Sequence, residues 1–174
     1  MQFQDRLIDE IPHLRRFARS LAGSVHDADD LVQATLERAL TRGAQLRNPG
    51  SLRSWLFRIL YNVHLSARAR SSAGEIPTDF TESDTLTPPV PPRDGAQLDA
   101  RTVLAALAAL PVDQRAALTL TAVEELSYSE AAAALDIPVG TLMSRIFRGR
   151  QRLRTLFDPA QCNEGTKHPL KSIK

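Results

Sequence analysis

Arginine and small polar side chains are concentrated between Pro138 and Phe157, near the end of the chain. This stretch contains five arginines and no acidic residue. Arginine can neutralise phosphates or pair with a guanine edge, while serine, threonine and glutamine reach base edges and backbone oxygens. On a helical wheel the polar residues share one side: Thr141, Ser144, Arg148, Gln151 and Thr155, with Arg145 and Arg152 on its flank. The pattern favours DNA binding over a helix that is merely solvated.

Cations and aromatic rings also alternate along an earlier helical segment. On its wheel one side carries Arg53, Phe57, Tyr61, His64 and Arg68. Exposed rings stack on unpaired bases and arginines follow the nucleic-acid backbone, so this side suits single-stranded nucleic acid. Packing of Phe57 and Tyr61 against another helix explains the same pattern equally well, and the sequence alone leaves both readings open.

Other chemistries find no support in the sequence. The histidines are scattered and none pairs at i, i+4 with another histidine or a cysteine: His13, His26, His64 and His168. Cys162 has no partner for a disulfide or a cysteine-based zinc site. No nucleophile motif, glycine-rich phosphate loop or spaced carboxylate pair is present. We therefore expect no catalytic residues, no metal, no cofactor, and a protein that is not an enzyme.

The predicted elements around the arginine-rich segment occur in the order of a helix-turn-helix. Ser127 to Glu130 has the spacing of a capping box and predicts a short helix over Ala131 to Leu135. Asp136 to Gly140 predicts a turn, and a longer helix follows over Val139 to Phe157. The apolar seam of that helix consists of Leu142, Ile146, Leu153 and Phe157.

The rest of the chain also reads as helical. Apolar spacings of three and four predict a helix through Leu7 and Leu21 that ends near Gly23, and another from Asp27 to Gly43. Asn48-Pro49 predicts the start of a third, which buries Leu52, Trp55, Leu56, Ile59 and Val63. Leu104, Leu107 and Leu110 indicate a helix that stops at Pro111, and a further helix covers Arg115 to Val123. The fold class is all-α, with no strand pattern of useful length.

Charge and proline content divide the chain into two small helical domains. Residues 1–70 carry a net charge of +4, residues 71–100 a net charge of −5 with five prolines, and residues 101–174 a net charge of +3. Proline interrupts helices and central strands, so residues 71–100 are predicted to be a flexible acidic linker. The predicted domains are residues 1–70 and 101–157, and residues 158–174 are expected to form a disordered tail.

The location of the protein is expected to be cytoplasmic. No apolar run approaches the roughly 18 residues of a membrane span, so no membrane contact of its own is expected. Charged residues stand where a secretory signal would be apolar: Asp5, Arg6, Asp9 and Glu10.

Three stretches together resemble the extracytoplasmic-function (ECF) sigma factors of the sigma-70 superfamily. They are Asp27 to Gln33, Ser54 to Asn62, and Pro138 to Arg148. They occur in the order of that family, and the resemblance covers about residues 5–70 and 100–157. It implies a sigma-2-like bundle, a sigma-4-like helix-turn-helix, and a protein that brings core RNA polymerase to promoter DNA and promotes melting.

The resemblance also implies roles for individual residues. The segment Asp29 to Glu37 would dock on the clamp helices of polymerase, through Asp30, Leu31, Gln33 and Glu37. The loop Gln45 to Ser51 and the helix Leu52 to Arg70 would recognise the −10 element. In this helix, the candidates for holding the unpaired DNA strand are Arg53, Arg58, Tyr61 and Asn62. The helix from Val139 would enter the major groove at the −35 element, with Ser144, Phe147 and Arg148 near bases and Thr141 and Arg145 near phosphates.

One residue departs from the family pattern, and two other functions remain as alternatives. Met143 stands where family members often carry lysine or arginine, which implies a different or weaker −35 preference there. The resemblance further implies an anti-sigma factor as a partner. The alternatives are a helix-turn-helix regulator that does not bind polymerase, and a sigma-like decoy that binds an anti-sigma factor without reaching DNA.

Overall fold

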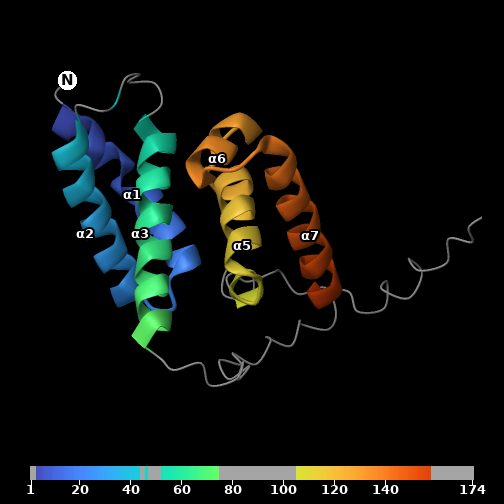
Figure 1. Cartoon of the computed structure of the whole chain (residues 1–174). Helices are drawn as coiled ribbons and strands as arrows, with labels where there is room; N and C mark the ends of the chain where they lie inside the picture. Colours follow the sequence, from blue (N-terminus) through green and yellow to red (C-terminus); the bar gives the residue numbers. More distant parts are fainter. Residues whose placement is uncertain (1–2, 44–45, 47–51, 75–104, 158–174) are drawn as a thin grey trace, which may run out of the picture.

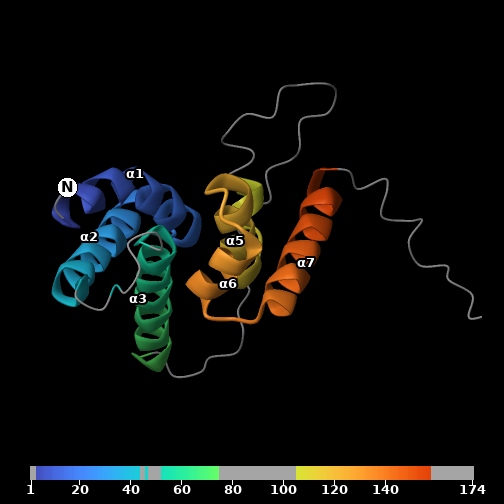
Figure 2. The same cartoon turned by 90° about the horizontal axis from the view of Figure 1, so that it is seen from above.

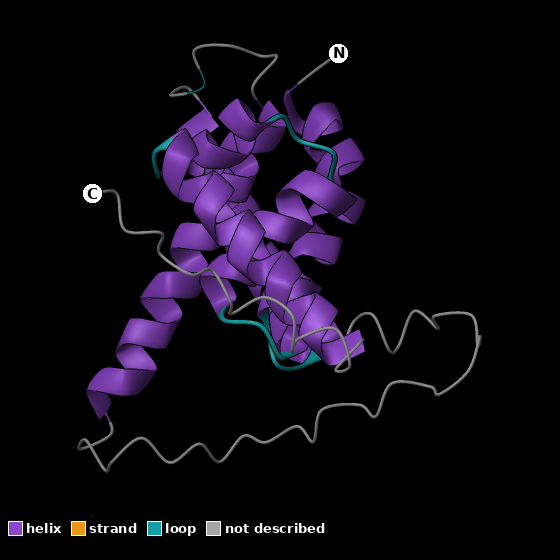
Figure 3. Cartoon of the chain, turned by 90° about the vertical axis from the view of Figure 1, so that its right-hand side faces the viewer, coloured by secondary structure: helices purple, strands orange, loops and turns teal. Residues whose placement is uncertain are grey.

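The computed structural model describes residues 3–43, 46, 52–74 and 105–157, and all its regular elements within these ranges are helices (Figures 1 and 3). In chain order they are α1 (Phe3–Leu21), α2 (Val25–Arg42), α3 (Leu52–Gly74), α5 (Val112–Leu118), the π-helical turn η3 (Thr119–Val123), α6 (Tyr128–Leu135) and α7 (Val139–Phe157). A short helical turn at residues 105–108 precedes α5. We call α1 to α3 the N-terminal unit and residues 105–157 the C-terminal unit.

The N-terminal unit is a bundle of three helices built on regular apolar spacing. The seam of α1 buries Leu7, Leu14, Phe17 and Leu21, and α1 arches across the bundle in Figure 2. Ser24 caps α2, because its hydroxyl oxygen accepts a hydrogen bond from the Asp27 backbone N–H at 3.1 Å. Leu56 and Leu60 of α3 are completely buried between the other helices. This packing fixes which faces of α2 and α3 remain available outside the bundle.

The C-terminal unit contains the helix-turn-helix that the sequence predicts. Ser127 and Glu130 form a capping box at the start of α6, with each side chain bonded to the other residue's backbone N–H. At the end of α6, Asp136 adopts a left-handed conformation with φ 56°, which aspartate tolerates better than most residues. The chain then turns into α7, whose Leu142 and Ile146 are buried. The turn thereby sets the direction of the arginine-rich helix.

A glycine permits α7 to lie close against α5. A Cβ atom at Gly149 would lie 2.7 Å from Leu118 Cδ1 and 3.4 Å from Gln114 Cβ. Leu118 and Gln114 are themselves buried, so neither can move aside freely. Gly149 is therefore required by packing, and it brings the two helices together at a distance that a larger residue would not allow.

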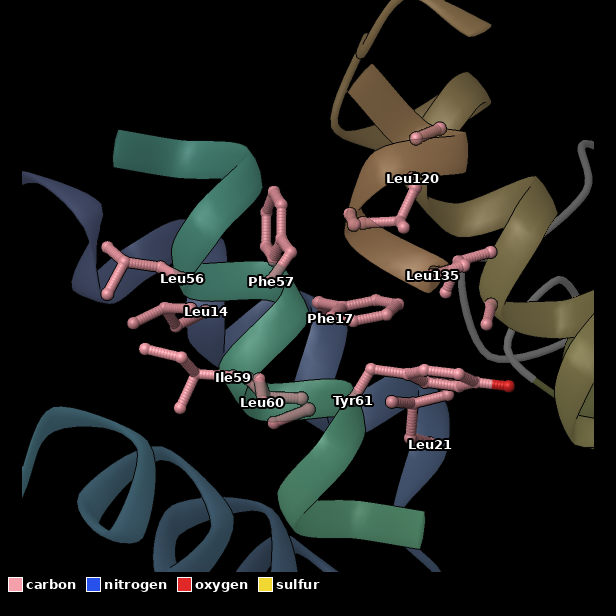
Figure 4. Packing of buried hydrophobic residues seen from close by; sticks show 14 of the residues in the cluster. Leu14, Phe17, Leu21, Leu56, Phe57, Ile59, Leu60, Tyr61, Leu120 and Leu135 are labelled. Atoms are coloured by element: carbon pink, nitrogen blue, oxygen red, sulfur yellow. The ribbon is translucent and has the colours of Figure 1, made fainter. Parts of the chain in front are cut away.

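The two units share one continuous core. Phe17 of α1 and Phe57 of α3 form an edge-to-face pair with ring centroids 5.1 Å apart. Both rings are completely buried. Figure 4 shows Phe17 and Tyr61 pointing toward the helices that carry Leu120 and Leu135. The buried residues of α1 to α3 and of α5 to α7 thus belong to a single cluster.

The predicted helices are confirmed, and several boundaries differ. The second helix begins at Val25 rather than Asp27, because Ser24 provides the cap. The third continues to Gly74, four residues into the segment predicted as linker. The helix predicted to start at Arg115 begins at Val112, directly after Pro111, and its last residues form the π-helical turn. The rest of the linker, the tail and almost all of the loop Gln45 to Ser51 lie outside the described residues.

Substitution of the packing glycine tests the α5–α7 contact. Gly149→Ala should destabilise the protein relative to Gly140→Ala, which places a Cβ at a helical position with nothing within 4 Å. Overpacking costs about 1–3 kcal/mol, whereas an unobstructed glycine-to-alanine change in a helix stabilises by up to about 1 kcal/mol. Denaturant unfolding of both variants measures the difference. Equal stabilities would contradict the close approach at Gly149.

Substitution of the cap serine tests the start of α6. Hydrogen bonds from the Ser127 hydroxyl and then from its backbone N–H lower the pKa of Glu130. A carboxyl with a lowered pKa contributes stability above its ordinary pKa, and that contribution disappears as the pH falls through the lowered value. Ser127→Ala should reduce the free energy of unfolding by about 1 kcal/mol near neutral pH and raise the pKa of Glu130. Unfolding measurements and an NMR titration of Glu130, with Ser66→Ala on α3 as the control, check both effects.

Candidate nucleic-acid interface

The outer face of α7 carries the polar residues that the sequence assigns to DNA. Leu142, Ile146 and Gly149 are buried on the inner face. The exposed residues of α7 include Thr141, Ser144, Phe147, Arg148 and Gln151. Ser144 Oγ donates to the Gly140 carbonyl at 3.0 Å. Figure 1 shows α7 at the edge of the molecule, away from the N-terminal unit. A cationic helical face that follows a tight turn has the form of a recognition helix.

Apolar groups lie beside this cationic face. Met143 and Phe147 are 53% and 61% exposed. Together with Tyr128, Arg150 and Arg154 they line a shallow hollow of about 210 Å³. Apolar side chains can contact thymine methyl groups in the major groove. Tyr128 was not selected from the sequence, because it precedes the turn and shares no helical repeat with α7.

Two arginines of α7 lie away from its open face. Arg145 Nε lies 3.4 Å from Asp113 Oδ2, and its side chain is 23% exposed. Arg152 Nη1 donates to Gln114 Oε1 at 3.1 Å. Both side chains therefore point toward the first turn of α5. The charge of Arg145, a predicted phosphate contact, also acts on the Tyr61 hydroxyl of α3, so Arg145 lies at the junction between the two units.

Two aromatic residues of α3, Phe57 and Tyr61, are buried. Phe57 is 0% exposed and Tyr61 is 6% exposed, so of the two readings that the sequence leaves open the structure favours packing against other helices. Helix α3 lies against α6 of the C-terminal unit, as Figures 1 and 4 show. Trp55, predicted to be buried, is half-buried. Burial raises the pKa of Tyr61, which keeps its hydroxyl protonated.

The other residues predicted to hold the −10 strand have different surroundings. Arg53 Nε donates to Glu10 Oε2 at 2.7 Å within the N-terminal unit. Arg58 Nη2 donates to Asp136 Oδ1 at 2.8 Å, across the two units. Asn62 is exposed. The structure therefore does not bring these residues and Tyr61 together on one open surface.

A buried carboxylate joins the two units. The Glu124 side chain is 0% exposed, and it accepts hydrogen bonds from Arg16 Nε at 2.9 Å and Arg16 Nη2 at 3.2 Å. His13 Nδ1 also contacts Glu124 Oε2. These interactions raise the pKa of Arg16, first through the hydrogen bond and then through the negative charge, against the opposing effect of burial. No periodicity in the sequence indicates this cluster, because its members come from helices of different units.

The residues predicted to contact polymerase lie along α2. Asp30, Gln33 and Glu37 are exposed, and Gln33 Nε2 donates to Glu37 Oε1 at 3.2 Å. Leu31 is 7% exposed and packs into the bundle. The structure thus leaves a polar, acidic strip on α2 and places Leu31 behind it.

Two further observations concern the described residues. They contain no group of three or more histidine, cysteine, aspartate or glutamate residues arranged to hold a metal ion. None of the described helices combines the length and the apolar character that crossing a bilayer requires.

Comparison with known proteins assigns the family. Residues 7–61 match the family described as the sigma2 domain of PhyR, and residues 100–153 match sigma-70 region 4. The chain is 39% identical over 154 residues to the ECF RNA polymerase sigma factor EcfG of Rhodopseudomonas palustris, covering 88% of this chain and 84% of that protein. The chain belongs to the ECF sigma factors.

Further relatives agree with this assignment. This ECF sigma factor is 34% identical to the RNA polymerase sigma-H factor of Pseudomonas aeruginosa, over 78% of its own length and 77% of that relative. Its structure resembles the sigma factor RpoE of Bartonella quintana, solved in complex with the anti-sigma factor NepR, with a TM-score of 0.70 and 32% identity. That likeness covers 88% of this chain and 95% of the other.

Proposed function

We propose that this ECF sigma factor directs core RNA polymerase to specific promoters and promotes DNA melting there. The observation that carries the proposal is the outer face of α7, where exposed arginines and hydroxyls follow a capped helix and a tight turn. A helix of this polarity fits the major groove, with Arg148 and Ser144 near base edges and Thr141 near a phosphate. Region 4 would therefore read the −35 element.

The N-terminal unit would supply the other two contacts. The exposed acidic strip on α2, Asp30 with Gln33 and Glu37, would dock on the clamp helices of polymerase. Helix α3 would engage the unpaired −10 strand through Arg53, Arg58, Tyr61 and Asn62. Each unit alone would bind DNA weakly, but attachment to polymerase makes the second contact intramolecular and raises its effective concentration. No bond is made or broken by these residues, so the proposed role is not enzymatic, and it is carried out in the cytoplasm on chromosomal DNA.

An anti-sigma factor is part of the proposal. The structurally similar RpoE was solved with the anti-sigma factor NepR, and CnrH, which is 28% identical with a TM-score of 0.63, with the cytosolic domain of CnrY. A regulator that works without polymerase would leave the acidic strip on α2 without a role. A decoy would not need a cationic α7 face open to solvent. Promoter-dependent run-off transcription with purified core polymerase and a randomised promoter library tests the proposal, and absence of any selected promoter would refute it.

The first prediction of this function separates the two promoter contacts. Arg148→Ala should lower −35-dependent transcription by about tenfold, since a bidentate arginine–guanine pair contributes about 1–3 kcal/mol of discrimination. It should also relax base preference at one position. Asn62→Ala should leave upstream binding intact and slow opening, measured by permanganate reactivity of unpaired thymines. Arg19→Ala removes the same charge from an exposed position on α1, outside the α7 face, and serves as the control. Equal loss of binding and opening in both variants would contradict the division of roles.

The second prediction concerns polymerase. Asp30→Asn combined with Glu37→Gln should weaken binding to core enzyme several-fold and reduce its dependence on salt, because exposed complementary charges accelerate association. Asp9→Asn with Glu125→Gln, which neutralises two exposed carboxylates outside the strip, is the matched control. Fluorescence anisotropy with labelled protein measures both affinities. Equal affinities in the two double variants would remove the strip from the proposed interface.

A further inference from the structure

We infer that a cavity between the end of α1, the start of α2 and α5 binds a small organic anion. Arg115 and Thr119 hold its carboxylate, and its aliphatic body lies against Val25 and Val123. We call this space the α1–α5 cavity. Its volume is about 720 Å³, and sites for small ligands usually have volumes of about 300–1,000 Å³. The inference concerns a small molecule and stands independently of the proposed function.

The lining of the α1–α5 cavity is cationic. Among the described residues it includes Arg16, Arg19 and Arg115 and no aspartate or glutamate. Glu124 compensates the charge of Arg16. In the same part of the chain, neither Arg19 nor Arg115 forms an ion pair. Uncompensated positive charge around a partly enclosed space attracts an anion.

Arg115 is a half-buried cation that only carbonyl groups stabilise within the described residues. Its Nη1 donates to the Ser20 carbonyl at 3.0 Å, and its Nη2 donates to the carbonyls of Ala108 and Leu110 at 2.9 and 2.8 Å. Its Nε is buried and has no hydrogen-bond partner there. Burial, and then the positive charge of Arg68, lower the pKa of Arg115. A carboxylate beside the guanidinium would offset both effects.

Thr119 supplies a second unused donor one helical turn after Arg115. Thr119 is 3% exposed, and its buried hydroxyl has no partner among the described residues. Buried polar groups nearly always have one, and Thr121 nearby donates to the Ala117 carbonyl at 2.8 Å. Rotation about χ1 turns a threonine hydroxyl without moving the backbone. The Thr119 hydroxyl can therefore reach a ligand in the cavity that its residue lines.

These two unused groups select the chemistry of the ligand. An arginine Nε only donates, and a hydroxyl can donate beside it, so the ligand must accept hydrogen bonds. A carboxylate accepts at both oxygens and carries the complementary charge. Ser20 and Ser24 also line the cavity, but their hydroxyls already bond within α1 and at the start of α2. Arg115 and Thr119 are thus the groups available to hold a carboxylate.

The rest of the cavity is an apolar wall. Val25 is 60% exposed and Val123 is 46% exposed, and both line the cavity together with Leu107 and Ala22. A bound aliphatic chain would remove this apolar surface from water, which favours binding. Inorganic phosphate would leave the wall uncovered. The combination of two donors with an apolar wall therefore fits an aliphatic carboxylate.

The test uses the full chain and three probes that separate charge from chain. Octanoate has both, 1-octanol has the chain without the charge, and inorganic phosphate has charge without the chain. Calorimetry measures affinity, and NMR of the methyl groups of Val25 and Val123 reports the place of binding. We expect octanoate to bind about tenfold or more tighter than either other probe. It should also raise the Tm, because a ligand that binds the folded state stabilises it.

A threonine pair tests the polar end of the cavity. Thr119→Val keeps the side-chain shape and should weaken octanoate binding about tenfold, since it removes a hydrogen bond to a charged group. The variant should unfold at or above the wild-type denaturant midpoint, because the lost hydroxyl had no partner. Thr121→Val makes the same change where the hydroxyl bonds to a carbonyl. It should keep the wild-type affinity for octanoate.

A valine pair tests the apolar end. Val25→Ser should weaken octanoate binding about threefold, because less apolar surface is then covered on binding. Val139→Ser is the matched control. Each of these valines is the first residue of its helix and is exposed, at 60% and 42%. Both variants should therefore fold, and Val139→Ser should bind octanoate as the wild type does.

Four outcomes would overturn the inference. Absence of saturable octanoate binding by the folded wild type would do so directly. Equal affinities for octanoate and inorganic phosphate would mean an adventitious anion site only. Equal affinities for octanoate and 1-octanol would show that Arg115 and Thr119 do not hold the carboxylate. Equal loss of octanoate affinity in Thr119→Val and Thr121→Val would place the ligand elsewhere.

Discussion

Burial of the Glu124 carboxylate is the constraint on which the arrangement of the two units depends. A charge taken out of water is tolerated when a cation and hydrogen bonds replace the lost hydration, and Arg16 and His13 do so here. Apolar surfaces could dock in many neighbouring orientations with similar energy. If the two units packed in another orientation, Glu124 would be buried without its partners. The buried charge therefore selects one orientation and adds little to the free energy of association. The π-helical turn and the left-handed Glu125, with φ 55°, bring the carboxylate to that position.

The elements and the inner face of α7 could be predicted because their signals are local. Ser127 and Glu130 are three residues apart, and both bonds of the capping box are present. The spacing of Leu142 and Ile146 repeats with the helix, so their burial follows from periodicity alone. The same reasoning placed Arg148 on the outside. Boundaries were less certain, since Ser24 and not the acidic run decides where α2 begins.

The junction between the units could not be predicted because its partners are distant in sequence. Glu124 and Arg16 are separated by 108 residues, and Arg58 and Asp136 by 78. A helical wheel shows that Phe57 lies opposite the inner seam of its bundle, but it cannot show what covers that side. An aromatic face that stacks on bases and one that packs on another helix have the same composition. In this ECF sigma factor Phe57 packs against Phe17 of α1, and α3 lies against α6. That assignment required the tertiary structure.

The segment between α3 and the C-terminal unit joins the two halves covalently. Their association is therefore a unimolecular reaction, and its equilibrium constant carries no concentration unit. Dilution cannot separate them, and synthesis of more protein cannot drive them together. The proportion of molecules whose two units are docked would therefore be the same in a cell with few copies as in one with many.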